Sequence, residues 1–393
     1  MTEQDRRRLA LELSSLSVFR GILKSDTLEA LLQFLNENSV ENKTRLFGQF
    51  VFSLADDNYC FSDFLRRKVY SDENKYITLT AQKAPIPKLL EENALFELRV
   101  FSKLTGLTAD ELWEGIEYDG YKPKFQNEAI DFTLEYKERL RNIDRYGYGI
   151  FATSKMFKVE EGEIIPVSSA DSVSIDDFVG YEAARQQVFD NTEALIEGKP
   201  AANVLLFGDA GTGKSSTVKA CANFFYDKGV RLIEIRKDQL FSLSYIMGRI
   251  ADNPLKFIIF IDDLSFNKND DCFSMLKAAL EGSASAKASN AVIYATSNRR
   301  HIVKENFSDR AADNDIHHSD TVQELLSLSD RFGLTVYFER PNKSLYLDIV
   351  HTLAQRSGVT MEQSELDIKA EAFALQKGSR SPRAAEQFIN SLI

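Results

Sequence analysis

Eight residues in the middle of the chain form a motif that is typical of phosphate binding. The segment from Gly208 to Ser215 reads Gly-Asp-Ala-Gly-Thr-Gly-Lys-Ser and fits the pattern G-x-x-x-x-G-K-[ST]. Glycines let a backbone wrap closely around a phosphate, and a helix that follows presents its positive amino-terminal end to that group. In this interpretation Lys214 contacts the β- and γ-phosphates, and Ser215 ligates Mg²⁺.

The residues on either side of the motif are those expected of a strand and a helix. Val204–Phe207 are apolar and predict a buried strand, and residues 216–226 predict a helix. A glycine-rich turn that matches by chance is the alternative, but this order of strand, loop and helix disfavours it. We therefore predict that a nucleotide binds along the whole loop, at Gly208, Asp209, Ala210, Gly211, Thr212, Gly213, Lys214, Ser215 and Ser216.

Two carboxylates follow a second apolar run some fifty residues later. Phe257–Ile261 predict a buried strand, and Asp262 and Asp263 come directly after it, at the edge of the sheet where ligands bind in such folds. Asp262 is expected to hold Mg²⁺ through its water shell, and Asp263 to orient or deprotonate the attacking water. Read alone, the pair is equally compatible with surface acids at a strand end.

A third strand, Ala291–Thr296, leads to Asn298. Its amide is expected to lie between the γ-phosphate and the water, although a loop cap would use the same residue type.

Composition narrows the functional classes. The 393 residues are 44% hydrophobic and 27% charged, as in ordinary globular proteins, and the net charge of −11 disfavours nucleic acid or an anionic membrane as a general partner. Neither a targeting segment nor an apolar run long enough to span a bilayer is visible, so we expect a cytoplasmic location. Isolated cysteines (Cys60, Cys221, Cys272) and the lone pair His317 and His318 suggest structural thiols and no metal set.

The patterning predicts four segments. Residues 1–145 read as a helical domain, in which Leu28, Leu31, Leu32 and Leu35 recur at helical spacing and Thr108 with Glu111 suggests a capping box. Residues 146–174 read as a β-hairpin and linker. Residues 175–340 alternate five strands with helical stretches, which predicts an α/β fold with a parallel five-stranded sheet between two helical layers. Residues 341–393 read as helices, the last one capped by Ser381.

Together these elements resemble the AAA+ ATPases over about residues 175–393. The resemblance implies a helical lid at residues 341–393, and it implies that Ile175–Gly180, and hence Val179 and Gly180, border the adenine. Asn298 matches the position called sensor 1. Arg383 lies where sensor 2 begins its helix, and it fits better than Arg380 because it lies inside the capped helix.

A narrower resemblance rests on the segments 297–301 and 381–388. They look like those of the uncharacterised bacterial ATPases known as domain of unknown function 815. Two features depart from most AAA+ proteins. Asp263 stands where most carry Glu, which implies slow hydrolysis, although replication initiators of that superfamily also carry two Asp. Arg236–Leu240 lacks the aromatic-apolar-Gly pore loop of protein unfoldases, which argues against threading of a substrate.

Arg331 lies where the AAA+ family carries its arginine finger, a residue that serves the site of a neighbouring subunit. This implies a homo-oligomer. Arg310 and Arg300 are rival candidates, and a surface ion pair with Asp330 is the plainer alternative.

The sequence thus predicts an ATP-binding protein with Mg²⁺-dependent ATP hydrolysis coupled to conformational change or assembly. The alternative is a slow or non-hydrolysing module, gated by nucleotide, whose helical first domain binds a protein partner. A weaker third hypothesis is a loader acting on nucleic acid, which the net charge opposes. No residue identifies the substrate or partner.

Overall fold

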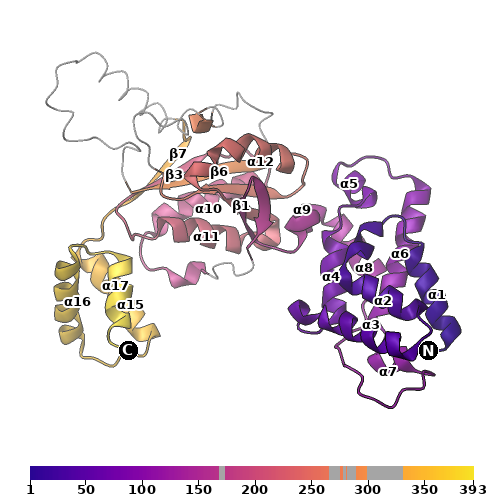
Figure 1. Cartoon of the computed structure of the whole chain (residues 1–393). Coiled ribbons are helices and arrows are strands. Elements are labelled where there is room, and N and C mark those ends of the chain that lie inside the picture. The colour runs from indigo at the N-terminus through magenta and orange to yellow at the C-terminus, as the bar shows by residue number, and fades with distance from the viewer. Residues whose placement is uncertain (168–172, 265–274, 278–279, 281–288, 299–330) are drawn as a thin grey trace. The chain divides into compact units, whose positions relative to one another are not determined.

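The computed structural model describes residues 1–167, 173–264, 275–277, 280, 289–298 and 331–393. They form two compact units, Met1–Thr153 and Ser154–Ile393, coloured along the chain in Figure 1. Among the described helices, none combines the length and the apolar character that crossing a bilayer requires.

The first unit is built from helices. The amphipathic helix predicted from its leucine spacing is confirmed as α2, which buries Leu28, Leu31 and Leu35. The bounds are α1 Glu3–Ser14, α2 Asp26–Asn36, α3 Val40–Phe52, α4 Phe61–Ser71, α5 Lys75–Ala81, α6 Lys88–Thr105, α7 Ala109–Trp113, α8 Phe132–Arg141 and α9 Ile143–Tyr146.

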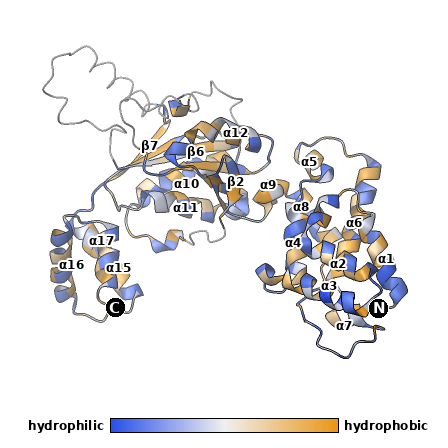
Figure 2. Cartoon of the chain, viewed as in Figure 1, coloured by the Kyte–Doolittle hydropathy of each residue, from blue (hydrophilic) through white to orange (hydrophobic). Residues whose placement is uncertain are grey.

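Aromatic rings fill the centre of this unit. Trp113 packs against Phe34 and Phe47 at ring-centroid distances of 5.6 and 5.4 Å. Such tilted and edge-on pairs add to the stabilisation that burial gives. Figure 2 shows hydrophobic and hydrophilic residues sharing the same helices, as expected of helices that cover a core with one face.

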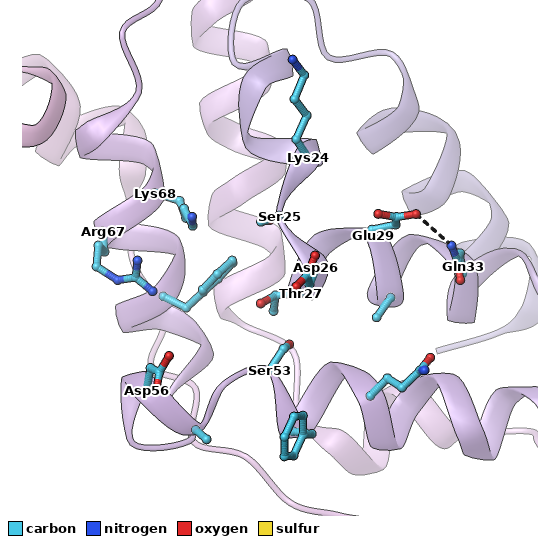
Figure 3. A pocket seen from close by; sticks show the side chains of 15 residues that line it. Lys24, Ser25, Asp26, Thr27, Glu29, Gln33, Ser53, Asp56, Arg67 and Lys68 are labelled. Carbon is cyan, nitrogen blue, oxygen red and sulfur yellow. Dashed lines mark hydrogen bonds between the residues drawn. The ribbon is translucent and has the colours of Figure 1, made fainter. Parts of the chain in front are cut away.

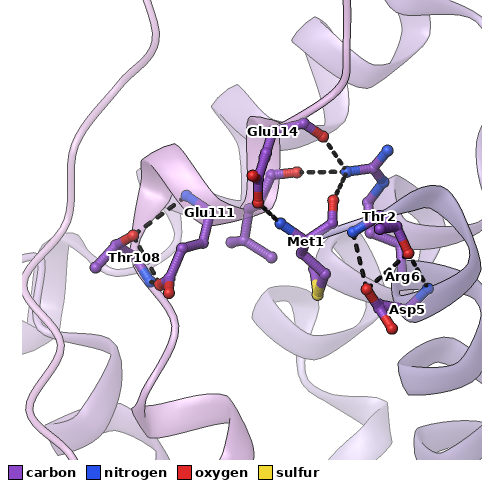
Figure 4. A network of polar contacts seen from close by, with 8 residues as sticks. Met1, Thr2, Asp5, Arg6, Thr108, Glu111 and Glu114 are labelled. Atoms are coloured by element: carbon purple, nitrogen blue, oxygen red, sulfur yellow. Dashed lines mark hydrogen bonds and ion pairs between the residues drawn. The ribbon is translucent and has the colours of Figure 1, made fainter.

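A buried arginine ties the start of the unit to α7 (Figure 4). One terminal nitrogen of Arg6 donates to the carbonyls of Leu112 and Glu114, at 3.4 and 2.7 Å, where α7 ends and its carbonyls lack partners within the helix. The predicted capping box is confirmed at the other end of α7, where Thr108 and Glu111 bond to each other's backbone. Side chains therefore form hydrogen bonds with the unpaired backbone groups at both ends of this short helix.

The second unit is organised on a mixed sheet in the order β2-β1-β4-β5-β6-β3-β7. The predicted α/β fold is confirmed, but the sheet has seven strands, and the prediction of five was wrong in number. The difference arises because the hairpin β1–β2 joins the sheet: β1 pairs parallel with β4, and β2 adds an antiparallel edge. The strands are β1 Met156–Glu160, β2 Glu163–Pro166, β3 Val204–Gly208, β4 Val230–Glu234, β5 Lys256–Ile261, β6 Ala291–Ser297 and β7 Leu334–Phe338.

Helices cover both faces of this sheet. α10 (Glu182–Ile196) and α11 (Lys214–Phe224) pack on one face, and α12 (Leu243–Ile250) lies on the other (Figure 1). Burial raises the pKa of the Cys221 thiol on α11 to about 12, so this thiol stays protonated and acts as a core residue.

The chain ends in three helices that share a separate core. They are α15 (Lys343–Arg356), α16 (Gln363–Lys377) and α17 (Pro382–Asn390). The Ser381 hydroxyl accepts a hydrogen bond from the Ala384 amide, so the predicted cap of the last helix is confirmed. We call these helices the lid.

Candidate nucleotide-binding site

The glycine-rich loop connects β3 to α11 and depends on the absence of side chains at two positions. Gly208 has a φ of +137°, and a Cβ there would lie 2.1 Å from the carbonyl oxygen of Phe338 on the neighbouring strand. Gly213, with a φ of +89°, turns the chain into the first residue of α11. Both conformations lie in the left-handed region that favours glycine, so the motif's glycines are required by geometry.

Lys214 turns back over this loop. Its side-chain nitrogen donates to the carbonyls of Gly208 and Asp209, at 3.0 and 2.7 Å, and the residue is only 5% exposed. Burial lowers the pKa of the ammonium, and the carboxylates of Asp209, Asp262 and Asp263 oppose this shift, although no ion pair joins them to Lys214 in the part of the chain that the structure describes. A buried cation whose hydrogen bonds go only to carbonyls is suited to an incoming anion, because the anion would pair with it directly.

Ser215 and Asp262 bring the two predicted motifs together. The Ser215 hydroxyl donates to Oδ1 of Asp262 at 2.6 Å, and the Thr296 hydroxyl donates to the same oxygen at 2.5 Å. Hydroxyl and carboxylate oxygens are the ligands that Mg²⁺ takes in proteins, commonly one or two of them with water completing the shell. The residues present therefore fit a magnesium ion bound by Ser215 and Asp262.

Asp263 and Asn298 lie side by side. The Asn298 amide donates to Oδ1 of Asp263 at 2.8 Å, and both side chains are exposed to the cavity described next. Asp263 adopts a φ of +50°, and its own amide donates to the Thr296 hydroxyl at 3.0 Å. Thr296 thus contacts both aspartates and holds a backbone conformation that is uncommon for a side-chain-bearing residue.

These groups surround a cavity of about 750 Å³. It is bounded by the glycine-rich loop, the carboxyl ends of β5 and β6, the segment before α10, and the lid. Of the predicted site residues, those that line it are Val179, Ala210, Gly211, Thr212, Gly213, Lys214, Ser215, Ser216, Asp262, Asp263, Asn298 and Arg383. Gly208 and Asp209 do not line the cavity, and Gly180 faces the lid, where a Cβ would meet Leu345.

The lid reaches the loop through the start of α17. The amide of Arg383 donates to the Gly211 carbonyl at 3.3 Å, and a Cβ on Gly211 would come within 3.1 Å of the Arg383 side chain. Arg380, the rival candidate, donates to both carboxylate oxygens of Glu371 within the lid and does not line the cavity. The structure therefore brings Arg383, and not Arg380, to the loop.

Arg331 lies away from this cavity. It precedes β7, whose first residue pairs with Val204, whereas Gly208 pairs with the last residue of β7. The glycine-rich loop and Arg331 therefore flank opposite ends of the parallel strands, and Arg331 does not line the site. Arg300, Arg310, His317, His318 and Cys272 lie outside the described residues.

Several cavity residues were missed by the sequence reasoning. Thr296 ends a predicted strand, and a hydroxyl residue at that point of a buried strand was a usable signal. Arg185 lies over the Phe178 ring with its guanidinium 5.0 Å from the ring centroid, and burial lowers the pKa of this arginine. Arg356, at the end of α15, carries no sequence signal because its partners are backbone carbonyls of residues far away in the chain.

A second cavity, of about 810 Å³, lies within the first unit (Figure 3). It is bounded by the start of α2, the end of α3 and one face of α4. Positively and negatively charged side chains line it, among them Lys24, Asp26, Asp56 and Lys68. It contains none of the predicted site residues.

The fold and the site define a class. A mostly parallel sheet with a glycine-rich loop after one strand, a carboxylate pair at the end of another, and a helical lid over both is the architecture of a P-loop fold. The family model described as "Protein of unknown function (DUF815)" matches residues 152–393, and the chain belongs to this family.

Solved structures and curated proteins were also compared. The chain resembles the RuvB Holliday junction branch migration motor of Thermotoga maritima at 15% identity and a TM-score of 0.38, covering 56% of this chain and 63% of that chain. Two variants of the same motor give identities of 15% and 14% with the same coverage and TM-score. This chain therefore spans less than two thirds of the RuvB chain that it matches. The comparison with curated proteins gives no match.

Proposed function

We propose that the chain binds ATP with Mg²⁺ in the 750 Å³ cavity and hydrolyses it. The observation that carries the proposal is the 2.6 Å hydrogen bond between Ser215 and Asp262. It joins the end of the phosphate-binding loop to a strand-end carboxylate 47 residues away in the chain, beside a buried lysine that carbonyls alone hold. A phosphate chain would pair with the lysine, and a hard metal ion would bind the hydroxyl and carboxylate oxygens.

Each residue then has a role in the reaction. Lys214 and the loop amides would bind the β- and γ-phosphates, and Ser215 and Asp262 would hold the metal ion, whose charge would offset that of the phosphate oxygens. Asp263 accepts a proton from the attacking water or orients it, and Asn298 fixes the carboxylate through its 2.8 Å hydrogen bond. Arg383 approaches the phosphates from the lid.

The proposal extends to assembly. Arg331 flanks the end of the strands opposite the loop, so in this role it serves the site of a neighbouring copy and completes it by neutralising charge during transfer. A homo-oligomer follows from this role, and the protein partner or substrate is unspecified.

One observation favours the alternative of a nucleotide-gated binding module with negligible hydrolysis. Asp263 is one methylene shorter than a glutamate, and its carboxylate is already engaged by Asn298. Such a carboxylate is less free to reach a water molecule. In this alternative ATP orders the lid, and the helical first unit engages a partner.

Turnover and particle mass separate the two proposals. We expect the wild type and the control Lys228→Ala to hydrolyse ATP, and Lys214→Ala and Asp263→Asn to lose activity. Lys228 is an exposed residue at the end of the 3₁₀ helix η5 (Tyr226–Lys228) and does not line the cavity. Wild-type turnover equal to that of Lys214→Ala would exclude the enzyme. If Arg331→Ala keeps full turnover, or if light scattering finds a fully active monomer, the neighbouring-copy role of Arg331 is wrong.

A further inference from the structure

The lid meets the rest of its unit at both ends of the cavity. At the phosphate end, the Arg383 amide contacts the Gly211 carbonyl. At the other end, the guanidinium of Arg356 donates to the carbonyls of Asp176 and Asp177, at 2.6 and 2.9 Å. Because the loop fixes the phosphates, the end lined by Phe178, Val179 and the lid is the one left for the nucleoside.

The segment that Arg356 contacts is a strap between the sheet and the lid. It runs from a short 3₁₀ helix, η4 (Ile175–Asp177), to Gly180. Ile175 packs with the core of the sheet, whereas Val179 packs with the core of the lid. Arg356 therefore contacts this strap between Ile175, which packs on the sheet, and Val179, which packs on the lid.

The helix α15 presents one face to the cavity. Ile349, Leu353 and Arg356 are spaced four and three residues apart, and all three line the cavity. Ile349 and Leu353 give this end of the cavity an apolar wall, and Arg356 lies at the end of that wall with two charge-assisted hydrogen bonds.

The chain leaves the strap through a tight turn. Gly180 and Tyr181 both have positive φ, +76° and +61°, and the Tyr181 hydroxyl donates to the Glu339 carbonyl at 2.7 Å, where the chain leaves β7 for the lid. This hydrogen bond joins the end of the strap to the segment that leads into the lid. Among the described residues, the hydrogen bonds of Arg356 then hold the strap against α15.

We propose that Arg356 is a positioning residue that closes the nucleoside end of the cavity by holding residues 176–177 against the lid. This inference rests on the proposed binding of ATP and goes beyond it, because it assigns nucleoside affinity to a contact far from the phosphates. Its signature is selective: the nucleoside part of the affinity depends on Arg356, and the phosphate part does not.

Binding of ATP and of tripolyphosphate, both with Mg²⁺, tests this in the full chain by calorimetry. Arg356 and its two partner residues are exposed to solvent, which weakens these hydrogen bonds, so Arg356→Ala is expected to weaken ATP binding about threefold to fivefold and to leave tripolyphosphate binding unchanged. Arg356→Lys, which can donate to one carbonyl, is expected to bind ATP with an affinity between those of the wild type and Arg356→Ala. The matched control is Arg340→Ala, since Arg340 also donates to a carbonyl, that of Gly378, but does not line the cavity.

The outcomes are distinguishable. If Arg356→Ala binds ATP as tightly as the wild type, or if ATP and tripolyphosphate weaken together, Arg356 does not position the nucleoside end. If the wild type binds neither ligand, the proposed function itself fails. A ligand-free measurement adds a further check: amide hydrogen exchange at residues 176–180 is expected to be faster in Arg356→Ala than in Arg340→Ala, and equal rates would contradict the role.

Discussion

The chain holds two cavities of similar volume, about 750 Å³ in the second unit and about 810 Å³ in the first, that differ in what their walls are made of. In the second unit, loop backbone and strand ends form the wall opposite the lid, and polar groups of this wall bond to one another, as Ser215, Asp262 and Thr296 do. In the first, side chains of helices form the wall, and Phe52 stands 78% exposed at its rim.

The difference shows that cavity volume is a poor guide to chemistry here. A site that binds a charged group needs donors fixed in advance, because ordering flexible side chains costs conformational entropy. The backbone turn at Gly208–Gly213 is fixed by its conformation, whereas Lys24 and Lys68 in the first unit lie on flexible stems. We therefore expect paired substitutions in the two cavities to have unequal effects.

The largest contrast is expected between two glycines. Gly208→Ala places a Cβ 2.1 Å from the Phe338 carbonyl oxygen at a φ of +137°, so we expect its unit to lose about 3 kcal/mol of unfolding free energy or more. Gly48 lies within α3 with open space around it, and Gly48→Ala is expected to stabilise the first unit by about 0.5–1 kcal/mol. Urea unfolding followed by hydrogen exchange in each unit measures the two changes in unfolding free energy. Changes of the same sign for Gly208→Ala and Gly48→Ala would contradict the contrast.

A pair of aspartates gives the next largest effect. Asp263→Asn is expected to reduce ATP turnover about 100-fold or more while keeping nucleotide binding, because a general base is lost. Asp56→Asn, in the first cavity, is expected to leave both unchanged. Steady-state turnover with ATP binding measured in parallel decides this, and an active Asp263→Asn would remove that residue from the reaction.

Two buried threonines sharpen the comparison further. Thr296 is 2% exposed and bonds to both aspartates, and Thr27 is 3% exposed and lines the first cavity. Thr296→Val removes the hydroxyl that donates to Oδ1 of Asp262 and accepts from the Asp263 amide, so we expect the Mg²⁺ concentration for half-maximal turnover to rise about tenfold. Thr27→Val is expected to leave it unchanged. An unshifted Mg²⁺ dependence in Thr296→Val would show that Thr296 does not position Asp262.

The smallest expected effect concerns the lid. The hydrogen bonds from Arg380 hold the pKa of the Glu371 carboxyl below its usual 4.5. Since the folded-state pKa is the lower one, the pair stabilises the lid above pH 4.5, and this stabilisation is lost as the pH falls through the folded-state pKa. We expect Arg380→Ala to lower Tm by about 1–3 °C at pH 7 and to converge with the wild type in acid.

The control for this pair lies in the first unit. Arg67 bonds to Asp57 with similar geometry, at 2.9 and 2.6 Å, but in the other unit, so Arg67→Ala is expected to leave the Tm of the second unit unchanged at pH 7 and in acid. A Tm difference between Arg380→Ala and the wild type that persists unchanged below pH 3 would contradict the assignment.

Much of the second unit was predictable, and for a local reason. A phosphate-binding loop, a strand ending in two aspartates and a capped last helix each occupy a short stretch whose backbone needs specific residue types, such as Gly208 and Ser381. The two extra strands of the sheet were not predictable. The hairpin at 156–166 extends the sheet only because it pairs with β4, some 75 residues later in the chain. The choice of a distant strand as pairing partner leaves no local pattern in the sequence.

The contacts made by Arg356 and the first cavity were not predictable either. Arg356 donates to carbonyls, which every residue carries, so no residue type marks its partners. The first cavity arises from the packing of α2, α3 and α4, whose sequences show only amphipathic spacing. Amphipathic spacing indicates which face is buried and leaves the hollows between helices undetermined.

Calorimetric titration of ATP with Mg²⁺ into the full chain, into Lys214→Ala and into Lys68→Ala tests the central claim most directly. We predict one nucleotide per chain for the wild type and for Lys68→Ala, and at least about a 100-fold loss of affinity for Lys214→Ala, because the buried ammonium faces the phosphates. Equal ATP affinity in the wild type and Lys214→Ala, or a loss in Lys68→Ala instead, would contradict the assignment of the nucleotide to the glycine-rich loop.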